Sequence, residues 1–335
     1  MASMTAFAVC LILGPVIIKW LKSKDASHNH SRVGFGAISD KSQHKAHVPT
    51  MGGLLITLSI VIANLIWADL GNQYLWIALI GMIALGLIGY LDDRLKLNSR
   101  SSKGLPGNVK ILGQTIIVVV LVMYMAHLNN TWSIIQIPFF KDLSLDIGWL
   151  YFPFAWLVIV GASNAVNLTD GLDGLAIGCS IFVSLTFGVV AYLTGHIIFA
   201  EYLYLPYIAP SGELTVFCAS IMGAGLGFLW FNAHPAEIFM GDTGSLSIGG
   251  ALGIVALLIK KEFLLALVGG IFAVEAISVI LQVLSFKLTG KRIFLMAPLH
   301  HHFQMKGMVE SKIVIRFWII SIILTLAGLA TLKLR

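Results

Sequence analysis

The sequence predicts an all-α polytopic membrane protein that folds as one domain over residues 1–335. Three observations support this prediction. Hydrophobic residues make up 58% of the chain and charged residues only 11%, whereas a soluble globular protein carries about 25% charged residues. The mean hydropathy is +0.90. The apolar residues also form continuous runs of about 17–24 residues, the length that an α-helix needs to cross a bilayer.

About ten such runs follow one another, and polar stretches separate them. The first run has no basic leader and no small-residue cleavage site, so we expect a retained span and not a removed signal. The second run opens at a glycine pair, the third ends at an acidic pair, and polar motifs flank the later ones. The expected transmembrane helices occupy residues 4–21, 51–69, 75–91, 109–127, 149–166, 174–195, 213–231, 245–261, 263–286 and 313–332.

Basic residues orient these spans. The connections 22–47, 92–110 and 287–312 carry five Lys or Arg residues each, whereas the connections and terminus on the other side carry five in total. The side richer in Lys and Arg is cytoplasmic in inner-membrane proteins, so both termini are expected outside. The formal net charge of +6 therefore reflects topology and contact with lipid phosphates, and it gives no reason to expect a nucleic-acid partner.

The cysteines and the extracytoplasmic connections carry little functional signal. Cys10, Cys179 and Cys218 lie inside apolar runs, so we expect buried thiols and neither a disulfide framework nor a zinc site. The stretch 128–148 is expected to form a hairpin around "SIIQIPFFKDLSLDIGW". The stretch 196–212 predicts no chemistry.

Two polar motifs open on the expected cytoplasmic face near the N-terminus. "HKAHVPTMGG" (44–53) ends at the glycine pair that opens a span. "LDDRLK" (91–96) places Asp92 and Asp93 at an expected helix C-terminus, where the helix dipole disfavours carboxylates. The pair is therefore either functional or a solvated salt-bridge cluster with Arg94 and Lys96.

The stretch "SNAVNLTDGLDGL" (163–175) is a third motif on this face. Asn164 and Asn167 are three residues apart, as are Asp170 and Asp173, so each pair can share a helical face. Gly171 and Gly174 are expected to interrupt the helix as a short re-entry. The order of residues does not fit a calcium loop. The alternative is a helix cap in which Asp173 or Thr169 satisfies backbone donors.

A fourth motif, "FMGDTGS" (239–245), places Asp242 just before a span, where a helix N-terminus favours anions and phosphate. The alternative is a plain N-cap aspartate. Together the motifs place five aspartates and many basic residues on one membrane face. Carboxylate oxygens and water form the usual shell of Mg²⁺, and cations suit a diphosphate, so the sequence predicts metal-assisted phosphoryl transfer at the cytoplasmic interface.

"APLHHHFQMKG" (297–307) contains three adjacent histidines. They cannot all ligate one zinc ion from a regular element. In an extended backbone His300 and His302 would share a face suited to a phosphate or sugar; the alternative is a solvated loop. Within the spans, "GAGLG" (223–227) predicts close helix packing. Glu275 is either functional or an internal hydrogen-bonding partner for a neighbouring helix.

In combination, these motifs resemble the polyprenyl-phosphate N-acetylhexosamine-1-phosphate transferases, and within them the phospho-N-acetylmuramoyl-pentapeptide branch. The resemblance covers nearly the whole chain, and the unbroken histidine run favours that branch. The chain departs from the family pattern at His47, Val48, Arg100 and Gln304. The matching segments are "PTMGG" (49–53), "DDRLK" (92–96), "KGL" (103–105), "NAVNLTDGLDGLA" (164–176), "FNAHPAEIFMGDTGS" (231–245) and "APLHHHF" (297–303).

The resemblance implies a Mg²⁺-dependent enzyme of the bacterial inner membrane that makes a peptidoglycan precursor. Undecaprenyl phosphate would attack UDP-N-acetylmuramoyl-pentapeptide, giving lipid I and UMP, either in one step or through a covalent phospho-enzyme. It also implies a homodimer. Two rivals remain: the N-acetylglucosamine-phosphate branch of the family, and an ion-coupled transporter, whose site would lie nearer the membrane midplane.

The resemblance also assigns roles to the matching positions. Asp242 and Asp173 would ligate the metal, and Asp92 would deprotonate or position the lipid phosphate. Phe239 would stack on uracil. The implied catalytic residues are Asp92, Asp93, Asp242 and His300. The implied substrate-binding residues are Lys45, Thr50, Lys96, Lys110, Asn164, Asn167, Asp170, Asp173, Asn232, Phe239, Gly241, Ser245, His301 and His302.

Overall fold

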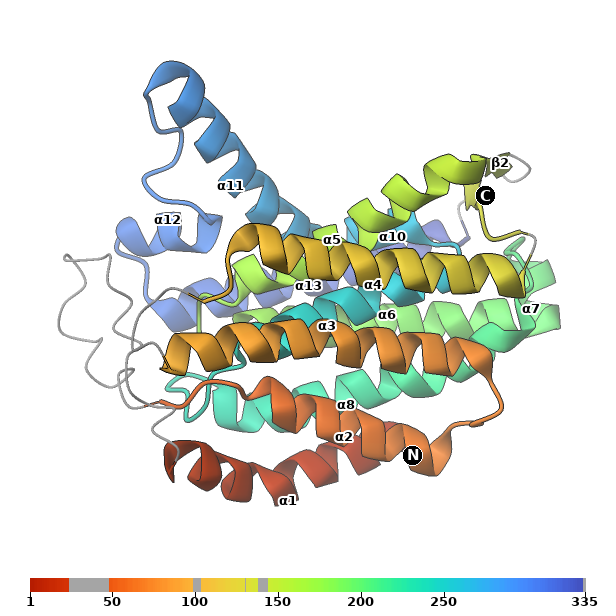
Figure 1. Cartoon of the computed structure of the whole chain (residues 1–335), viewed down its shortest axis with the longest axis horizontal. Coiled ribbons are helices and arrows are strands. Elements are labelled where there is room, and N and C mark those ends of the chain that lie inside the picture. The colour runs from red at the N-terminus through yellow and green to blue at the C-terminus, as the bar shows by residue number, and fades with distance from the viewer. Residues whose placement is uncertain (24–47, 99–103, 130, 138–143, 334–335) are drawn as a thin grey trace.

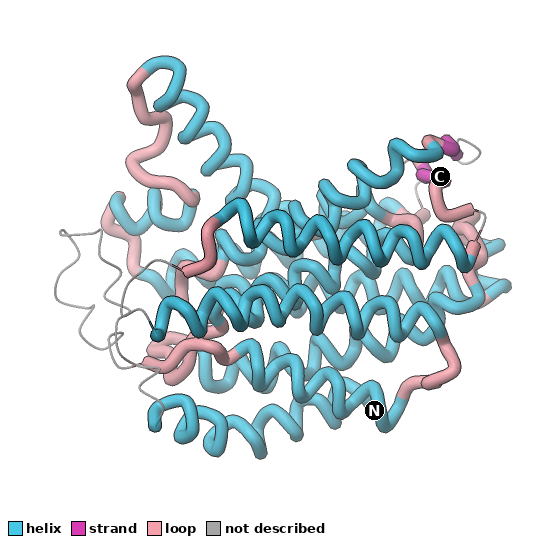
Figure 2. The backbone as a smooth tube through the Cα atoms, in the orientation of Figure 1, coloured by secondary structure: helices cyan, strands magenta, loops and turns pink. Residues whose placement is uncertain are grey.

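The computed structural model describes residues 1–23, 48–98, 104–129, 131–137 and 144–333. Within these ranges the chain is almost entirely helical, apart from one small antiparallel hairpin (Figure 2). In chain order the elements are α1 (Ala2–Ser23), α2 (Gly53–Trp67), α3 (Gln73–Asn98), α4 (Gly107–Leu128), β1 (Ile134–Gln136), β2 (Ser144–Asp146), η2 (Gly148–Leu150), α5 (Tyr151–Thr169), α6 (Leu175–Gly195), α7 (Ile197–Tyr202), η3 (Ala209–Glu213), α8 (Leu214–Asn232), α9 (Gly241–Leu258), α10 (Glu262–Val268), α11 (Gly270–Thr289), α12 (Leu299–Met305) and α13 (Glu310–Thr331).

The helical content confirms the expected polytopic membrane architecture. In the described part of the chain, nine helical segments are long and apolar enough to cross a membrane, and α2 is a shorter apolar helix of 15 residues. Each of the ten expected spans therefore contains a helix. Most helices run along one common direction, and the start of α1 and the end of α13 lie at the same end of the bundle (Figure 1). We call the other end, where α3 ends and α9 begins, the site end.

Helix α9 forms the centre of the bundle. Every residue from Thr243 to Leu258 is buried, whereas α11 buries only Ile271, Phe272, Glu275 and Ser278. A helix that is apolar all round is stable only when other helices surround it. By contrast, the distal half of α11 projects away from the bundle (Figure 1) and leaves its apolar side chains exposed, as expected for a surface in contact with lipid.

Glycines allow α9 to lie unusually close to its neighbours at the site end. A Cβ atom on Gly89 of α3 would lie 2.1 Å from the carbonyl oxygen of Asp242. A Cβ atom on Gly53 of α2 would lie 2.1 Å from the nitrogen of Gly244. Only a residue without a side chain permits these approaches. The "PTMGG" segment is further tied to the start of α9, because Gly52 N–H and Gly53 N–H donate to the carbonyls of Phe239 and Met240.

The structure corrects two of the elements expected from the sequence and confirms a third. Helix α3 continues to Asn98, so the acidic pair lies inside the helix and not at its C-terminus as predicted. The apolar run ends at Leu91, but the helix extends beyond it into the polar residues. The expected span 263–286 is broken at Gly269 into α10 and α11, since glycine is a poor helix former. The expected hairpin is confirmed by β1 and β2, which pair in antiparallel register.

Candidate active site

Three aspartates from two helices meet at the site end. The carboxylate groups of Asp92, Asp93 and Asp242 each offer an oxygen within 4.8 Å of the others. Asp92 and Asp93 lie on α3, and Asp242 lies in the first turn of α9. Asp92 and Asp93 are buried, and Asp242 is half-buried. Burial of the α3 pair contradicts the alternative in which these residues form a solvated salt-bridge cluster.

The Asp93 carboxylate caps the N-terminus of α9. Its Oδ1 accepts the backbone N–H of Asp242 at 3.2 Å, and its Oδ2 accepts the N–H and the hydroxyl of Thr243 at 2.9 and 2.7 Å. The first backbone N–H groups of a helix have no partner within the helix, and a carboxylate there also complements the helix dipole. The positive φ of Gly241, +71°, lets the chain turn sharply beside this carboxylate.

Asp242 is therefore not the plain N-cap that the sequence left as an alternative. Its Oδ2 lies 2.6 Å from Lys110 Nζ and 3.2 Å from Lys96 Nζ. Its Oδ1 accepts a hydrogen bond from Asn167 Nδ2 at 2.8 Å, and the same amide group donates to Ser245 Oγ. Side chains from α3, α4 and α5 thus converge on one carboxylate of α9, and each of them was predicted as a site residue.

Asp92 has a different environment from its neighbour. Its Oδ2 lies 2.5 Å from Lys96 Nζ, one helical turn further along α3. Its Oδ1 accepts the backbone N–H of Leu105, just before α4 begins. Lys96 therefore bridges Asp92 and Asp242, which places an ammonium group between two carboxylates that would otherwise repel each other.

The donor set of this cluster fits a hard divalent cation. Magnesium takes oxygen ligands, usually one or two carboxylates together with water and substrate phosphates. Three carboxylates within 4.8 Å provide more negative charge than Lys96 and Lys110 neutralise. The two ammonium groups are also suited to phosphate oxygens, so the cluster combines both kinds of group that phosphoryl transfer requires.

Asp173 belongs to a second cluster and not to the first. Its carboxylate lies within 4.8 Å of ligand atoms of His234 and Glu310, and its Oδ2 lies 3.0 Å from His234 Nδ1. The backbone N–H of Asp173 donates to Glu310 Oε1. The structure therefore places the two aspartates predicted to share a metal ion, Asp173 and Asp242, in different groups of side chains.

The loop between α5 and α6 carries Asp173 of this second cluster, whereas His234 follows α8 and Glu310 begins α13. Helix α5 ends at Thr169 and α6 begins at Leu175, so the predicted break occurs as a tight turn between two separate helices. Asn232 is buried and stabilises this turn: its Oδ1 accepts Gly174 N–H, and its Nδ2 donates to the carbonyl of Ile238. A helix cap by Thr169 is not observed, because its hydroxyl donates back to Ala165 within α5.

The histidine run is helical, which corrects both expectations for it. Residues 299–305 form α12, so His300 and His302 do not share an extended face. His300 points inward and is fully buried. His301 Nδ1 lies 2.7 Å from Gln304 Oε1, and His302 Nδ1 accepts the backbone N–H of Leu295. A seven-residue helix between polar segments has too short a periodic pattern to be recognised from sequence.

The remaining predicted residues have varied positions. Asn164 Nδ2 donates to Gln114 Oε1 of α4 and not to the carboxylate cluster. Thr50 is buried beside the start of α9, and Phe239 is partly exposed there. Asp170 lies in the α5–α6 turn. Lys45 lies outside the described residues.

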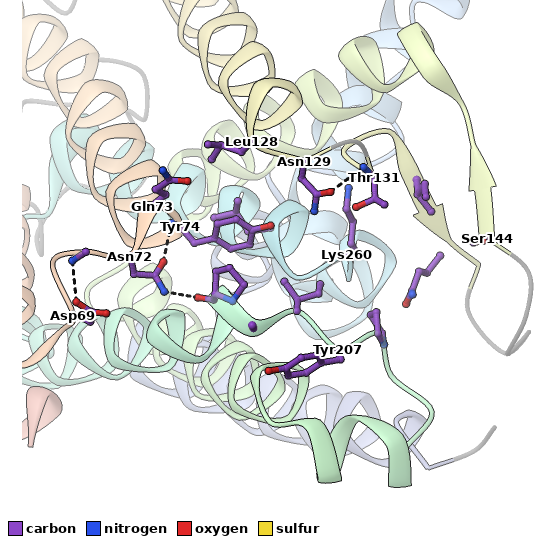
Figure 3. A pocket seen from close by; sticks show the side chains of 18 residues that line it. Asp69, Asn72, Gln73, Tyr74, Leu128, Asn129, Thr131, Ser144, Tyr207 and Lys260 are labelled. Atoms are coloured by element: carbon purple, nitrogen blue, oxygen red, sulfur yellow. Dashed lines mark hydrogen bonds between the residues drawn. The ribbon is translucent and has the colours of Figure 1, made fainter.

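A cavity of about 720 Å³ lies at the opposite end of the bundle (Figure 3). Amide and hydroxyl side chains line much of it, and the Asn72 amide donates to the carbonyl of Pro210 across its wall. Its other polar lining residues include Gln73, Asn129 and Thr131. None of the residues predicted for the site lines this cavity. Its lining residues come largely from polar connections between helices that form no recognisable motif, so the cavity could not be predicted from the sequence.

Comparison with known proteins gives a consistent result. Residues 75–260 match the family model described as glycosyl transferase family 4. A phospho-N-acetylmuramoyl-pentapeptide-transferase from Granulibacter bethesdensis is 52% identical over 339 residues. Proteins of the same name from Thermodesulfovibrio yellowstonii and Maridesulfovibrio salexigens are 51% and 49% identical. Each alignment covers 100% of this chain and 92% of the relative's own length.

Proposed function

The chain belongs to glycosyl transferase family 4 and, within it, to the phospho-N-acetylmuramoyl-pentapeptide transferases, which are phosphotransferases; from this premise we propose its reaction. It transfers phospho-N-acetylmuramoyl-pentapeptide from the UDP-linked form to undecaprenyl phosphate. The products are lipid I and UMP. The enzyme acts in the bacterial inner membrane, with the site end on the cytoplasmic side, because the basic connections follow helices that end there.

One phosphoanhydride replaces another in this reaction. An oxygen of the lipid phosphate forms a bond to the β-phosphorus of the nucleotide sugar. The bond from that phosphorus to the bridging oxygen breaks, and UMP leaves with this oxygen. Because one anhydride is lost and one is gained, the step needs no ATP; it needs alignment of two anions and screening of their charge.

The single observation that carries the proposal is the convergence of Asp92, Asp242, Lys96 and Lys110 at one end of the bundle. A soluble nucleotide sugar and a membrane-held lipid phosphate can meet only where the helices reach the aqueous phase. At that position a group of carboxylates and ammonium groups can hold both substrates. A transporter would instead need such groups near the midplane of the spans.

Asp242 and Asp92 would hold Mg²⁺, with Asp173 as a ligand only if substrate binding brings the two clusters together. When bound, the ion screens the negative charge of the two phosphate groups. Lys96 and Lys110 donate to phosphate oxygens, and Asn167 keeps the Asp242 carboxylate in its orientation. Asp93 acts by holding the start of α9, since its oxygens already bind that helix. Asp92 positions or deprotonates the lipid phosphate.

The α5–α6 turn and the segment 231–241 would bind the nucleotide-sugar end. Asp170 and Asp173 lie in this turn, and Asn232 connects it to the segment that carries Phe239. Phe239 would stack on uracil, and the residue is partly exposed at this position. His301 and His302 complete the phosphate-binding surface, with Lys45 contributing from its loop.

Purified protein in detergent or nanodiscs tests this function. UMP release would be measured with polyprenyl phosphate, Mg²⁺ and either UDP-N-acetylmuramoyl-pentapeptide or UDP-N-acetylglucosamine. We expect UMP release with the muramoyl-pentapeptide substrate, loss of it with EDTA and recovery with added Mg²⁺. Release only with UDP-N-acetylglucosamine would favour the other branch of the family, and release with neither would refute the proposal.

A further inference from the structure

Glu275 lies within a membrane-spanning helix and contacts a predicted catalytic residue. It is on α11 and has no exposed surface, and His300 on α12 is equally buried. Glu275 Oε1 accepts the backbone N–H of His300 at 3.1 Å. Glu275 Oε2 lies 3.1 Å from Nδ1 of the same residue. Both oxygens of one carboxylate are thus directed at one histidine.

The contact favours one of the two possible positions for the proton of the imidazole ring. A carboxylate can only accept hydrogen bonds, so its approach to Nδ1 favours a proton on that nitrogen. Without this N–H and the backbone N–H, a buried carboxylate in a membrane span would be strongly unfavourable. The second ring nitrogen, Nε2, then keeps its lone pair and can accept a hydrogen bond from another group.

His300 Nε2 is buried and has no hydrogen-bonding partner among the described residues. It faces the α5–α6 turn: a Cβ atom on Gly171 would lie 2.1 Å from it. Gly171 lies between Asp170 and Asp173, which we assign to nucleotide-sugar binding. Buried polar atoms almost always have a partner, so an unpartnered one at this position indicates a partner that arrives with the substrate.

We infer that Glu275 is a positioning residue of the transferase site, which sets the orientation and tautomer of His300 so that Nε2 can accept a hydrogen bond from a hydroxyl or amide N–H group of the nucleotide sugar when that substrate occupies the α5–α6 turn. The inference rests on the function proposed above. Glu275 also holds the N-terminus of α12, and through it the helix that carries His301 and His302. The contact resolves the two roles that the sequence left open for Glu275, because the internal partner is itself a predicted site residue.

The substitution Glu275→Gln distinguishes a role in positioning His300 from a role in stabilising the fold. Glutamine has the same shape and its oxygen can still accept the His300 backbone N–H. Its NH₂ group, however, donates to Nδ1 and moves the ring proton to Nε2. We expect kcat/KM for the nucleotide sugar to fall about 10- to 100-fold, the range seen when a partner that orients a functional histidine is lost. The KM for the lipid phosphate and the melting temperature should change little.

Glu262→Gln is the matched control. Glu262 is another buried glutamate, but it begins α10 at the opposite end of the bundle and accepts a hydrogen bond from the Tyr151 hydroxyl. The kcat/KM of the Glu262→Gln variant should equal that of the wild type. If Glu275 only supported the fold, Glu275→Gln would lower the melting temperature while the activity of the folded fraction stayed at the wild-type value, and this result would overturn the inference.

A double mutant shows whether Glu275 acts through His300. When two residues act as a unit, their combined loss is smaller than the product of the separate losses. The kcat/KM of Glu275→Gln/His300→Ala should therefore equal that of His300→Ala alone. A further multiplicative loss in the double mutant would mean that Glu275 acts by another route.

A spectroscopic measurement keeps this inference distinct from the reaction itself. The ¹⁵N spectrum of protein labelled at histidine, with His300 assigned by difference from His300→Ala, reports which ring nitrogen carries the proton. We expect a proton on Nδ1 in the wild type and on Nε2 in Glu275→Gln. An unchanged tautomer would overturn the inference even in an active enzyme. A wild type that shows the tautomer but releases no UMP would refute the proposed function instead.

Discussion

Nζ of Lys110, in the first turn of α4, lies 2.6 Å from Oδ2 of Asp242, in the first turn of α9, although 132 residues separate them along the chain. Asn167 approaches the other oxygen of the same carboxylate from the end of α5. Three helix termini therefore meet around one side chain. The position of Asp242 depends on the packing of these helices and not on its local sequence.

Asp242→Asn should lower kcat by at least about 100-fold, the order observed when one electrostatic stabiliser is removed from an active site. The amide cannot supply the negative charge that pairs with a cation. Kinetics of UMP release as a function of Mg²⁺ concentration measure the effect. Asp146→Asn, in the exposed hairpin at the other end, is the matched control and should leave kcat unchanged. Near-full Mg²⁺-dependent activity in Asp242→Asn would remove this residue from the site.

Asp93→Ala should destabilise the protein as well as reduce activity. It leaves the N–H groups of Asp242 and Thr243 without their partner, and loss of a helix cap costs about 0.5–2 kcal/mol. We expect a melting temperature several degrees below that of the wild type, measured by fluorescence in detergent. A variant as stable as the wild type would show that the capping bonds contribute little.

Gly89→Ala should separate α3 from α9. The added Cβ atom would lie 2.1 Å from the backbone oxygen of Asp242, which cannot move without displacing the whole helix. Both the melting temperature and the transferase activity should fall. Gly161→Ala in α5 is the control, since its Cβ atom would meet nothing within 4 Å and alanine favours the helix. Equal behaviour of the two variants would contradict the close-packing argument.

Glu262 should make stability depend on pH. Burial raises the pKa of its carboxyl from 4.5 to about 7, and the nearby Lys260 only partly opposes this effect. The folded state then binds the proton more tightly than the unfolded state. The contribution of Glu262 to the free energy of unfolding is therefore fully present below pH 4.5 and is lost as the pH rises to about 7. The melting temperature should therefore fall across this window in the wild type. This component of the fall should be absent in Glu262→Gln, and identical profiles would contradict the assignment.

Much of the site could be identified from the sequence because its motifs lie where apolar runs end. Asp92, Asp242 and Asn167 were singled out on that basis, and the family resemblance added Lys96 and Lys110; the structure brings the five together. The different tasks of Asp92 and Asp93 could not be predicted. Adjacent aspartates look alike in a sequence, and only the position of α9 determines that one binds a helix terminus and the other faces Lys96.

The sequence by itself determined the membrane architecture, since runs of apolar residues of sufficient length have no other stable environment. It also determined which end of the helices collects the charged residues. Only the tertiary structure decided that Asp173 lies with His234 and Glu310, that the histidine run is a helix, and that Glu275 binds His300. These contacts join segments far apart in the chain, and their geometry depends on how closely the helices approach, which the glycines of α2 and α3 allow but no local pattern specifies.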